Sequence, residues 1–321
     1  MHATPLTILV PVDGSTLAAQ ALPYTRRLAS GRATLVLLRI LSAPEPIRDT
    51  VGRAIVPVDA AARWAEDAAR KDLEETAAEL RNVEPAGVVV VTEVRTGDPA
   101  EIILRVAAER GVDLIVMASH GRGAIGRVAF GSVADRVARA ASVPVMIVRP
   151  LDAPVELVPV EIRRVVVPLD GSDLAARALP VAQLLASRLQ LPVVLVRALD
   201  TAQAYGLLGD ALIVEDGVMK DAGHQASQEL ETVAAALREG GLTATTEIRI
   251  GPAFAAIANT ARPGDVVVLT SHGRSGVTRW LLGSVAEKLV RAGPAPVVLV
   301  PVGARATEKA SSRLPEPALA V

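Results

Sequence analysis

Two stretches of the sequence combine glycine and serine at one repeated spacing that suits an anion-binding loop. The first runs from Gly121 to Gly131-Ser132 and the second from Gly273 to Gly283-Ser284, with nine residues between the two glycines of each. An apolar, β-branched run precedes each stretch, and a helix-like run follows it. Glycine lets the backbone approach an anion closely, and a helix N-terminus offers free N–H groups and a favourable dipole. Both stretches therefore have the residues and the context of a phosphate-binding loop.

A second candidate is an Asp-Gly-Ser triplet that also occurs twice, from Asp13 to Ser15 and from Asp170 to Ser172. Each triplet ends the first apolar strand of its half, and open parallel sheets bind ligands at such strand ends. A carboxylate there can hold a ribose hydroxyl or a magnesium ion that bridges phosphates. The alternative is structural, because Asp starts turns and Ser caps helices. The pattern favours the ligand role and leaves the structural one open.

The glycine-bearing stretches also admit a purely structural interpretation. Ser132 with Asp135, and Ser284 with Glu287, match the capping box, which satisfies the first N–H groups of a helix without any ligand. For one copy alone that interpretation would suffice. Two copies, each preceded by a strand and paired with the same upstream Asp motif, instead favour a nucleotide phosphate site.

Histidine and arginine side chains lie close to both loops in the sequence. His120 and His272 directly precede the first loop glycine, where we expect a neutral imidazole that hydrogen-bonds to backbone. No Ser-His-acid constellation with an orienting partner is visible, so the sequence names no catalytic residue and leaves enzyme activity undecided. Four loop arginines are candidates for phosphate contacts, with a solvated surface position as the alternative for each: Arg122, Arg127, Arg274 and Arg279.

Composition narrows the possible functions. The 321 residues suggest about two domains, and half of them are hydrophobic, which is ample for two cores. A formal net charge of -1 and an aromatic content of 2% argue against a nucleic-acid partner. The absence of cysteine excludes disulfides, thiol catalysis and Cys-ligated zinc. Because we find no signal-type N-terminus and no apolar run of membrane-spanning length, we expect a soluble cytoplasmic protein without a membrane partner.

The two halves of the chain repeat each other in order. Ile8–Ser15 returns as Val165–Ser172, and Glu93–Gly97 returns as Glu247–Gly251. Such repetition indicates a tandem duplication of one domain of ordinary size. We expect the first domain at residues 1–150, a linker at 151–161, the second domain at 162–303 and a disordered tail at 304–321.

Apolar strands alternate with helical patterns within each half. In the first half we expect strands at residues 6–12, 34–41, 88–95, 114–117 and 145–148, and helices at residues 15–28, 59–80, 99–109 and 132–140. A stretch rich in proline and charge, residues 42–58, differs from its counterpart in the second half, residues 201–223. Short, fully apolar strands between helices predict an α/β fold, with a parallel sheet that is covered on both faces.

These motifs together resemble the universal stress protein family in its tandem, two-domain form. The ATP-binding members of that family carry Gly, two residues, Gly, nine residues, Gly, and then Ser or Thr. This chain keeps the second Gly, the nine-residue spacing and the final Gly-Ser in both halves, but Ala118 and Thr270 replace the first Gly. Backbone N–H groups survive that replacement. The larger Thr270, and the lack of a counterpart to Asp98 in the second half, predict that the first site binds nucleotide more tightly.

The resemblance implies two doubly wound, Rossmann-like domains, each with a five-stranded parallel sheet in the order 3-2-1-4-5. It implies ATP with Mg²⁺, adenine held by the backbone of the second strand, and Asp13 or Asp170 near ribose and metal. It also implies that the two fifth strands pair across a two-fold axis, so that one chain forms an internal pseudo-dimer, and further homodimerisation is open. The site residues it implies are Pro11, Val12, Asp13, Ile40, Ala118, His120, Gly121, Arg122, Gly131, Ser132 and Val133 in the first half, and Pro168, Leu169, Asp170, Ala198, Thr270, His272, Gly273, Arg274, Gly283, Ser284 and Val285 in the second.

The sequence thus predicts a stress-related sensing or regulatory module with one ATP site per domain. One alternative is an interaction module of the same fold that needs no nucleotide. The other is a slow ATP hydrolase. Related adenine-nucleotide hydrolases carry a Ser-Gly-Gly-x-Asp-Ser loop after the first strand, where this chain has Asp13-Gly14-Ser15. The sequence therefore favours the hydrolase least of these three functions.

Overall fold

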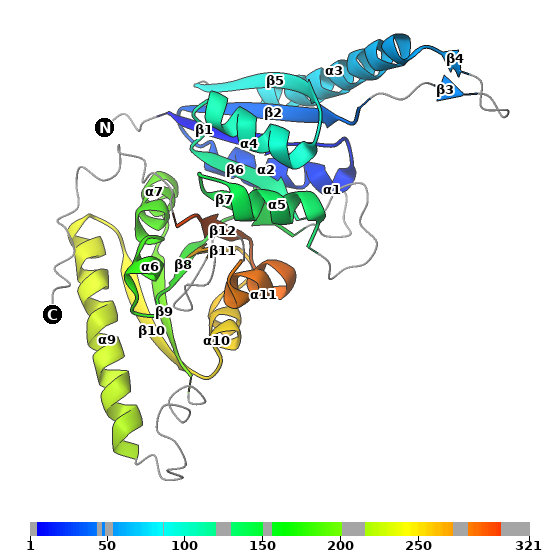
Figure 1. The fold of residues 1–321 in the computed structure, drawn as a ribbon. Helices are drawn as coiled ribbons and strands as arrows, with labels where there is room; N and C mark the ends of the chain where they lie inside the picture. The colour runs from blue at the N-terminus through cyan, green and yellow to red at the C-terminus, as the bar shows by residue number, and fades with distance from the viewer. Residues whose placement is uncertain are drawn as a thin grey trace. The chain divides into compact units, whose positions relative to one another are not determined.

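The computed structural model describes residues 5–43, 47–48, 54–85, 87–119, 130–149, 156–200, 216–271 and 282–302 (Figure 1). The chain divides into two compact units. Unit 1 covers residues 1–141 and 145–160, and unit 2 covers residues 142–144 and 161–321. The expected linker and domain boundaries stay a prediction, and the expected tail at 304–321 lies outside the described residues.

The sheet of unit 1 has five main strands. They are β1 (Leu6–Pro11), β2 (Ala33–Leu41), β5 (Val88–Thr96), β6 (Leu114–Ala118) and β7 (Val145–Val148). Their order is β5-β2-β1-β6-β7, and every pair in it is parallel. Counted along the chain this is the order 3-2-1-4-5, so the expected doubly wound fold is confirmed.

Unit 2 repeats the same topology. Its strands are β8 (Arg164–Pro168), β9 (Val193–Leu199), β10 (Ala244–Ile250), β11 (Asp265–Thr270) and β12 (Val297–Val300). Their order is β10-β9-β8-β11-β12, again with parallel pairing throughout. Tandem repetition in the sequence therefore corresponds to repetition of the fold.

Helices cover both faces of each sheet. Unit 1 contains α1 (Thr16–Ala19), α2 (Ala21–Leu28), α3 (Val58–Val83), α4 (Pro99–Glu109) and α5 (Ser132–Ala140). Unit 2 contains α6 (Asp173–Ala176), α7 (Leu179–Leu189), α9 (Asp216–Glu239), α10 (Ala253–Thr260) and α11 (Ser284–Ala292). Right-handed crossovers put α1, α2 and α3 on one face of the first sheet and α4 and α5 on the other; Figure 1 shows α4 and α5 in front of it.

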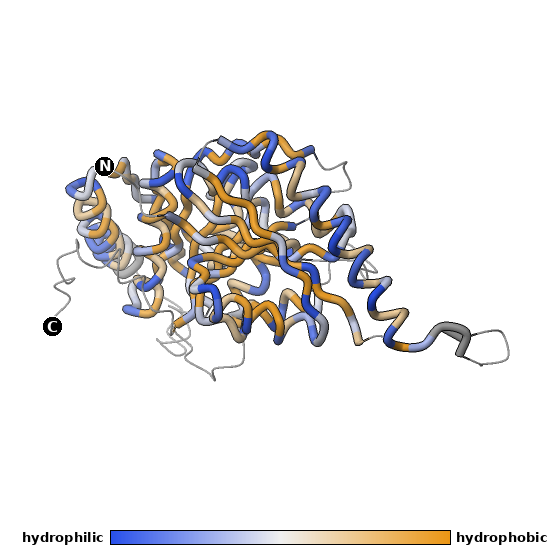
Figure 2. The backbone as a smooth tube through the Cα atoms, turned by 90° about the horizontal axis from the view of Figure 1, so that it is seen from above, coloured by the Kyte–Doolittle hydropathy of each residue, from blue (hydrophilic) through white to orange (hydrophobic). Residues whose placement is uncertain are grey.

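The core lies on the strands because their side chains are apolar on both sides. Ile8, Leu9 and Val10 in β1 are fully buried, and every residue of β6 and β11 is buried. Figure 2 shows the apolar residues concentrated along the strands, with polar residues on the outer helices. Within the described part of the chain, no helix combines the length and the apolar character that crossing a membrane requires.

The helix expected at residues 15–28 is divided in two. It ends as α1 at Ala19 and restarts as α2 at Ala21, and unit 2 has the same break between α6 and α7. Proline explains both breaks, because Pro23 and Pro180 have no N–H to donate to the carbonyl group four residues earlier. A second difference lies in the stretch 42–58, which contains two short antiparallel strands, β3 (Ile47–Arg48) and β4 (Ala54–Val56).

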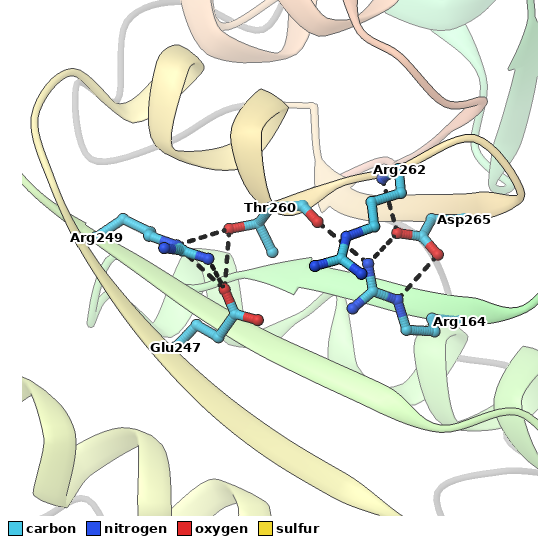
Figure 3. Close-up of polar contacts among 6 residues, drawn as sticks. All are labelled: Arg164, Glu247, Arg249, Thr260, Arg262 and Asp265. Atoms are coloured by element: carbon cyan, nitrogen blue, oxygen red, sulfur yellow. Dashed lines mark hydrogen bonds and ion pairs between the residues drawn. The ribbon is translucent and has the colours of Figure 1, made fainter.

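An ion pair joins the amino ends of β8 and β11 in unit 2 (Figure 3). Arg164 donates to both carboxylate oxygens of Asp265, from Nε at 3.0 Å and from Nη2 at 2.6 Å. Asp265 is 2% exposed and also accepts the backbone N–H of Arg262 at 2.8 Å. In unit 1 the matching carboxylate, Asp113, accepts the backbone N–H of Thr7 at 2.8 Å instead. The two units therefore fasten the same strand ends by different chemistry.

Candidate functional site

The Asp-Gly-Ser turn follows the carboxyl end of β1 and shapes the start of α1. Asp13 Oδ1 accepts hydrogen bonds from the Ser15 N–H at 2.9 Å and the Ser15 hydroxyl at 2.6 Å. Ser15 in turn caps α1 by accepting the Ala18 N–H at 3.1 Å. Gly14 has a φ of 76°, a left-handed value that glycine adopts without strain. The structural role considered from the sequence is therefore present in unit 1.

Unit 2 repeats this turn after β8. Asp170 Oδ1 accepts the Ser172 N–H at 3.0 Å and its hydroxyl at 2.6 Å, and Ser172 caps α6 through Ala175. A carboxylate offers about four lone-pair directions, so these bonds do not use up its capacity to accept. The aspartates hold the turn, and their carboxylates stand at the edge of the sheet where β1 and β8 end.

The glycine-bearing loop is anchored at both of its described ends. In unit 1 the Ser119 N–H donates to the Val148 carbonyl at 2.7 Å, and the Gly131 N–H donates to the Ser119 carbonyl at 2.9 Å. In unit 2 Gly283 donates to the Ser271 carbonyl at 2.8 Å. These bonds bring the start of α5 to the carboxyl end of β6, and the start of α11 to that of β11. Eight of the predicted contacts fall within the loops and lie outside the described residues: His120, Gly121, Arg122, Arg127, His272, Gly273, Arg274 and Arg279.

The helix that follows each loop begins without a side-chain cap. Gly131 is the N-cap of α5 and Gly283 the N-cap of α11, and neither helix has a cap bond from a side chain. The capping-box hypothesis is wrong, because Ser132 and Ser284 are the first helical residues and are exposed. The serine hydroxyls therefore do not accept hydrogen bonds from the first-turn N–H groups of these helices.

The acidic residues of the supposed capping boxes bind elsewhere. Asp135 accepts Nε of Arg139 at 2.9 Å, and Glu287 accepts Nε of Arg291 at 3.0 Å. Each of these pairs joins neighbouring turns of its own helix. The first amides of α5 and α11 therefore do not have these carboxylates as partners.

Ala118 and Thr270, which replace the first glycine of the family pattern, are strand residues. They end β6 and β11, pair in register with Val148 and Val300, and are 5% and 6% exposed. Among the described residues other than glycine, only Gln190 has a positive φ. Neither replacement strains the backbone, so the only difference that the threonine makes is its bulk and its hydroxyl.

The remaining predicted residues lie at the same edge. The Val12 N–H donates to the Leu38 carbonyl and the Leu169 N–H to the Val196 carbonyl, both at 2.9 Å, which carries the turn alongside the second strand. Half-buried side chains stand near the ends of those strands and in the first helical turns, at Ile40, Ala198, Val133 and Val285. Because β1 and β6 are parallel neighbours whose next helices lie on opposite faces, this edge is the topological switch point of the sheet.

A pair of arginines was missed from the sequence. Arg39 in β2 and Arg197 in β9 occupy equivalent positions, one residue before Ile40 and Ala198, and their side chains are 10% and 12% exposed. A buried guanidinium needs partners. The sequence pattern that indicates them is an arginine at the same place in both repeats, directly after a run of apolar strand residues.

One ion pair distinguishes the two units beside the site. In unit 1 Asp98 caps α4, and its Oδ2 accepts Nη1 of Arg136 in α5 at 2.7 Å. The pKa of the Asp98 carboxyl lies below its ordinary value, first because of that hydrogen bond and then because of the Glu101 backbone N–H. Unit 2 has Pro252 and Lys288 at the matching positions, so it lacks this link between the two helices.

Magnesium was predicted at Asp13 and Asp170. Within the described ranges no three His, Asp or Glu side chains come together to hold a metal ion. Magnesium commonly takes one or two carboxylates and completes its shell with water and substrate phosphate oxygens. A single Asp per unit fits that donor set only when a phosphorylated ligand is present.

Comparisons with known proteins agree with this architecture. The model of the universal stress protein family matches twice, at residues 6–149 and 161–301. A universal stress protein of Mycolicibacterium smegmatis is 27% identical over 316 residues, which is 93% of this chain and 98% of the relative. One from Thermus aquaticus is 33% identical over 147 residues, 44% of this chain and 98% of the relative.

A solved structure shows the same fold over almost the whole chain. It is a universal stress protein from Archaeoglobus fulgidus, with a TM-score of 0.67 at 21% identity, and the match covers 92% of this chain and 98% of that one. Two family domains in one chain, each with its own copy of the Asp-Gly-Ser turn and of the glycine-bearing loop, account for the internal repeat. The protein belongs to the universal stress protein family, in its tandem form.

Proposed function

We propose that this chain is a cytoplasmic sensing or regulatory module of the stress response that binds ATP with Mg²⁺, at one site in each unit. The observation that carries the proposal is the pairing of two features at one sheet edge. In each unit a carboxylate-bearing turn, with Asp13 or Asp170, lies at the switch point. The same edge carries the start of a helix whose N-cap, Gly131 or Gly283, provides no side-chain cap.

The phosphates are assigned to the start of α5 and α11. First-turn N–H groups and the helix dipole favour a bound anion, and the exposed hydroxyls of Ser132 and Ser284 are there to donate as well. Gly131 and Gly283 leave no side chain between the helix start and a ligand. His120, Gly121 and Arg122, with His272, Gly273 and Arg274, are proposed to complete the contacts from the loop.

The nucleoside is assigned to the strands on the other side of the switch point. Pro11 and Val12, or Pro168 and Leu169, carry the backbone from the first strand toward the Asp-Gly-Ser turn. The adenine is proposed to lie against the backbone near Ile40 or Ala198, and the carboxylate to reach ribose and metal. The proposal contains no hydrolytic step.

The proposal also keeps two features of the family resemblance that concern assembly. The fifth strands, Val145–Val148 and Val297–Val300, are proposed to pair within one chain, because each is an apolar strand that would otherwise end its sheet. Further association into a homodimer is left to measurement. The rival function, a nucleotide-independent interaction module, draws on the replacement of the first glycine by Ala118 and Thr270.

The decisive experiment titrates ATP, with and without Mg²⁺, into wild type and into the double variant Gly131→Val, Gly283→Val by calorimetry. Both glycines have extended backbone angles, with φ of -62° and -59°, that valine adopts freely. The double variant should therefore fold and lose binding. Ala140→Val with Ala292→Val is the matched control, since it introduces the same valine side chain at the exposed far ends of the same helices. A wild type that binds no ATP at millimolar concentration refutes the proposal and favours the interaction module.

A further inference from the structure

The second strand of each unit places one arginine at the sheet edge where the Asp-Gly-Ser turn lies. In unit 2 the register pairs Pro168 with Val196, so Arg197 stands one residue beyond the end of β8. In unit 1 the register pairs Pro11 with Leu38, and Arg39 has the same place. Up to this point β9 is entirely apolar, and Thr34 is the one polar residue of β2. The arginines therefore lie at the edge of the sheet that carries the proposed site, without belonging to any motif of that site.

Three contacts fix the Arg197 side chain. Its Nε donates to the Leu169 carbonyl at 3.0 Å, which is the residue immediately before Asp170. Its Nη1 donates to Oε2 of Glu229 in α9 at 2.5 Å. Its guanidinium also lies on Gly171, where a Cβ atom would meet both terminal nitrogens at 3.2 Å. One side chain thus bonds to the backbone before Asp170 and lies close to the backbone after it.

The carboxylate of Glu229 in α9 balances the charge of Arg197. The Glu229 side chain is 38% exposed, and Gln225 of the same helix donates to its other oxygen at 3.0 Å. Because a guanidinium that is only 12% exposed must keep hydrogen-bonded partners, the turn and α9 are held together. In unit 1 Arg39 is paired with Asp72 of α3, with Nη1 and Oδ2 3.7 Å apart.

We infer that Arg197 is a positioning residue, which fixes the turn that presents Asp170 and ties it to helix α9, and that Arg39 has this role in unit 1. The inference rests on the proposed nucleotide site and adds a residue to it that is not a ligand. Because Nε and Nη1 of Arg197 are directed at the Leu169 carbonyl and the Glu229 carboxylate, we assign this side chain to the turn and not to the phosphates. Its loss should disturb ribose and metal contacts at Asp170, whatever the number of phosphates on the ligand.

The first measurement needs no ligand. Amide hydrogen exchange in the free protein should be faster for the Ser172 N–H, which bonds to Asp170 Oδ1, in Arg197→Met than in wild type. Arg238→Met is the matched control. Arg238 also donates from Nε to a backbone carbonyl, that of Ala244 at 2.9 Å, and pairs with Glu231 of the same helix α9, but at the amino end of β10. The control should leave exchange at Ser172 unchanged, and equal exchange in wild type and Arg197→Met would overturn the inference.

The second measurement compares adenosine with ATP in a Gly131→Val background, so that only the second site reports. In Mg²⁺-free buffer, where the ribose contact of Asp170 is common to both ligands, Arg197→Met should weaken both by the same factor, roughly tenfold or more, as is usual for groups that orient a ligating side chain. Arg197→Lys should not rescue, because lysine lacks the Nε donor in a planar fork. Weakening of ATP alone, or full rescue by lysine, would overturn the inference.

Two safeguards keep these outcomes separate. If Arg197→Met does not fold, Arg39→Met in a Gly283→Val background asks the same question of unit 1. If wild type binds neither ATP nor adenosine, the proposed function fails, while the exchange measurement still decides whether Arg197 holds the turn.

Discussion

The Gly131 N–H donates to the Ser119 carbonyl at 2.9 Å and so joins the two ends of the loop in unit 1, as Gly283 and Ser271 do at 2.8 Å in unit 2. This bond sets the first residue of the helix directly beside the last residues of the fourth strand. A change of side-chain size at Ala118 or Thr270 is therefore expected to shift the start of the helix, where the phosphates are proposed to bind. The two units differ at that position by the size of one side chain.

That difference predicts unequal ATP affinities. Thr270 brings more bulk than Ala118 into a buried place, and such overpacking costs about 1–3 kcal/mol, which corresponds to roughly tenfold or more in affinity. Gly283→Val, which leaves the first site, should bind ATP more tightly than Gly131→Val, which leaves the second. Calorimetric titration of the two single variants makes the comparison. Equal affinities, or a tighter second site, would contradict it, and Thr270→Ala should narrow the gap.

Acid should remove the link between α4 and α5 in unit 1. The pKa of Asp98 is lowered in the folded state, first by the hydrogen bond from Arg136, so its contribution to stability is present above the unfolded pKa of about 3.9. That contribution is lost as the pH falls through the lowered folded value. Asp98→Asn keeps a good helix cap and should reduce the melting temperature of unit 1 near neutral pH.

The test of that link is a pair of thermal unfolding curves. Wild type and Asp98→Asn should differ at neutral pH and converge as the pH falls through the lowered folded-state pKa of Asp98, where its carboxyl is protonated. Lys288 in unit 2 has no such partner at Pro252, so Lys288→Gln serves as the control. A difference between wild type and Asp98→Asn that persists unchanged in acid would assign the effect to capping instead.

The two matching carboxylates at the amino ends of the sheets should differ in their contribution to stability. Asp265→Ala leaves the Arg164 guanidinium without its carboxylate partner and the Arg262 N–H without its acceptor (Figure 3). Breaking a buried ion pair costs about 3–5 kcal/mol. Asp113→Ala removes one acceptor from the Thr7 backbone N–H, which costs about 1–3 kcal/mol. Urea unfolding of both variants tests the order, and a larger loss in Asp113→Ala would show it to be wrong.

The proposed pairing of the fifth strands can be tested by cross-linking, because the chain has no cysteine of its own. A two-fold axis makes the paired strands antiparallel, so Met146→Cys combined with Leu299→Cys, and separately with Val298→Cys, samples neighbouring registers. A disulfide forms only when the Cα atoms come within about 7 Å. We expect one combination to give an intrachain bond, seen as faster migration without reductant. No bond in either combination, or bonds only between chains, would refute internal pairing.

Local patterns in the sequence were enough for most of the fold. Leu114–Met117 and Val145–Val148 read as buried strands from their apolar runs, and the structure places strands there. The break after Ala19 also has a local cause in the sequence, since Pro23 lies four residues later, whereas apolar periodicity alone predicts one continuous helix. Periodicity and proline act within a few residues of chain, so the sequence alone carries them.

The sequence by itself therefore determined the repeated α/β architecture, the glycine spacing and the Asp-Gly-Ser turns of this protein. Only the tertiary structure decided which groups satisfy one another. The N-cap of α5 is Gly131 rather than Ser132, and the Gly131 N–H donates to the Ser119 carbonyl at the other end of the loop. Arg197 pairs with Glu229, which is thirty-two residues away in the chain. Asp265 pairs with Arg164 on the neighbouring strand. Such partners follow from where distant strands and helices are packed, because a buried charge takes whichever acceptor the fold brings within hydrogen-bond distance.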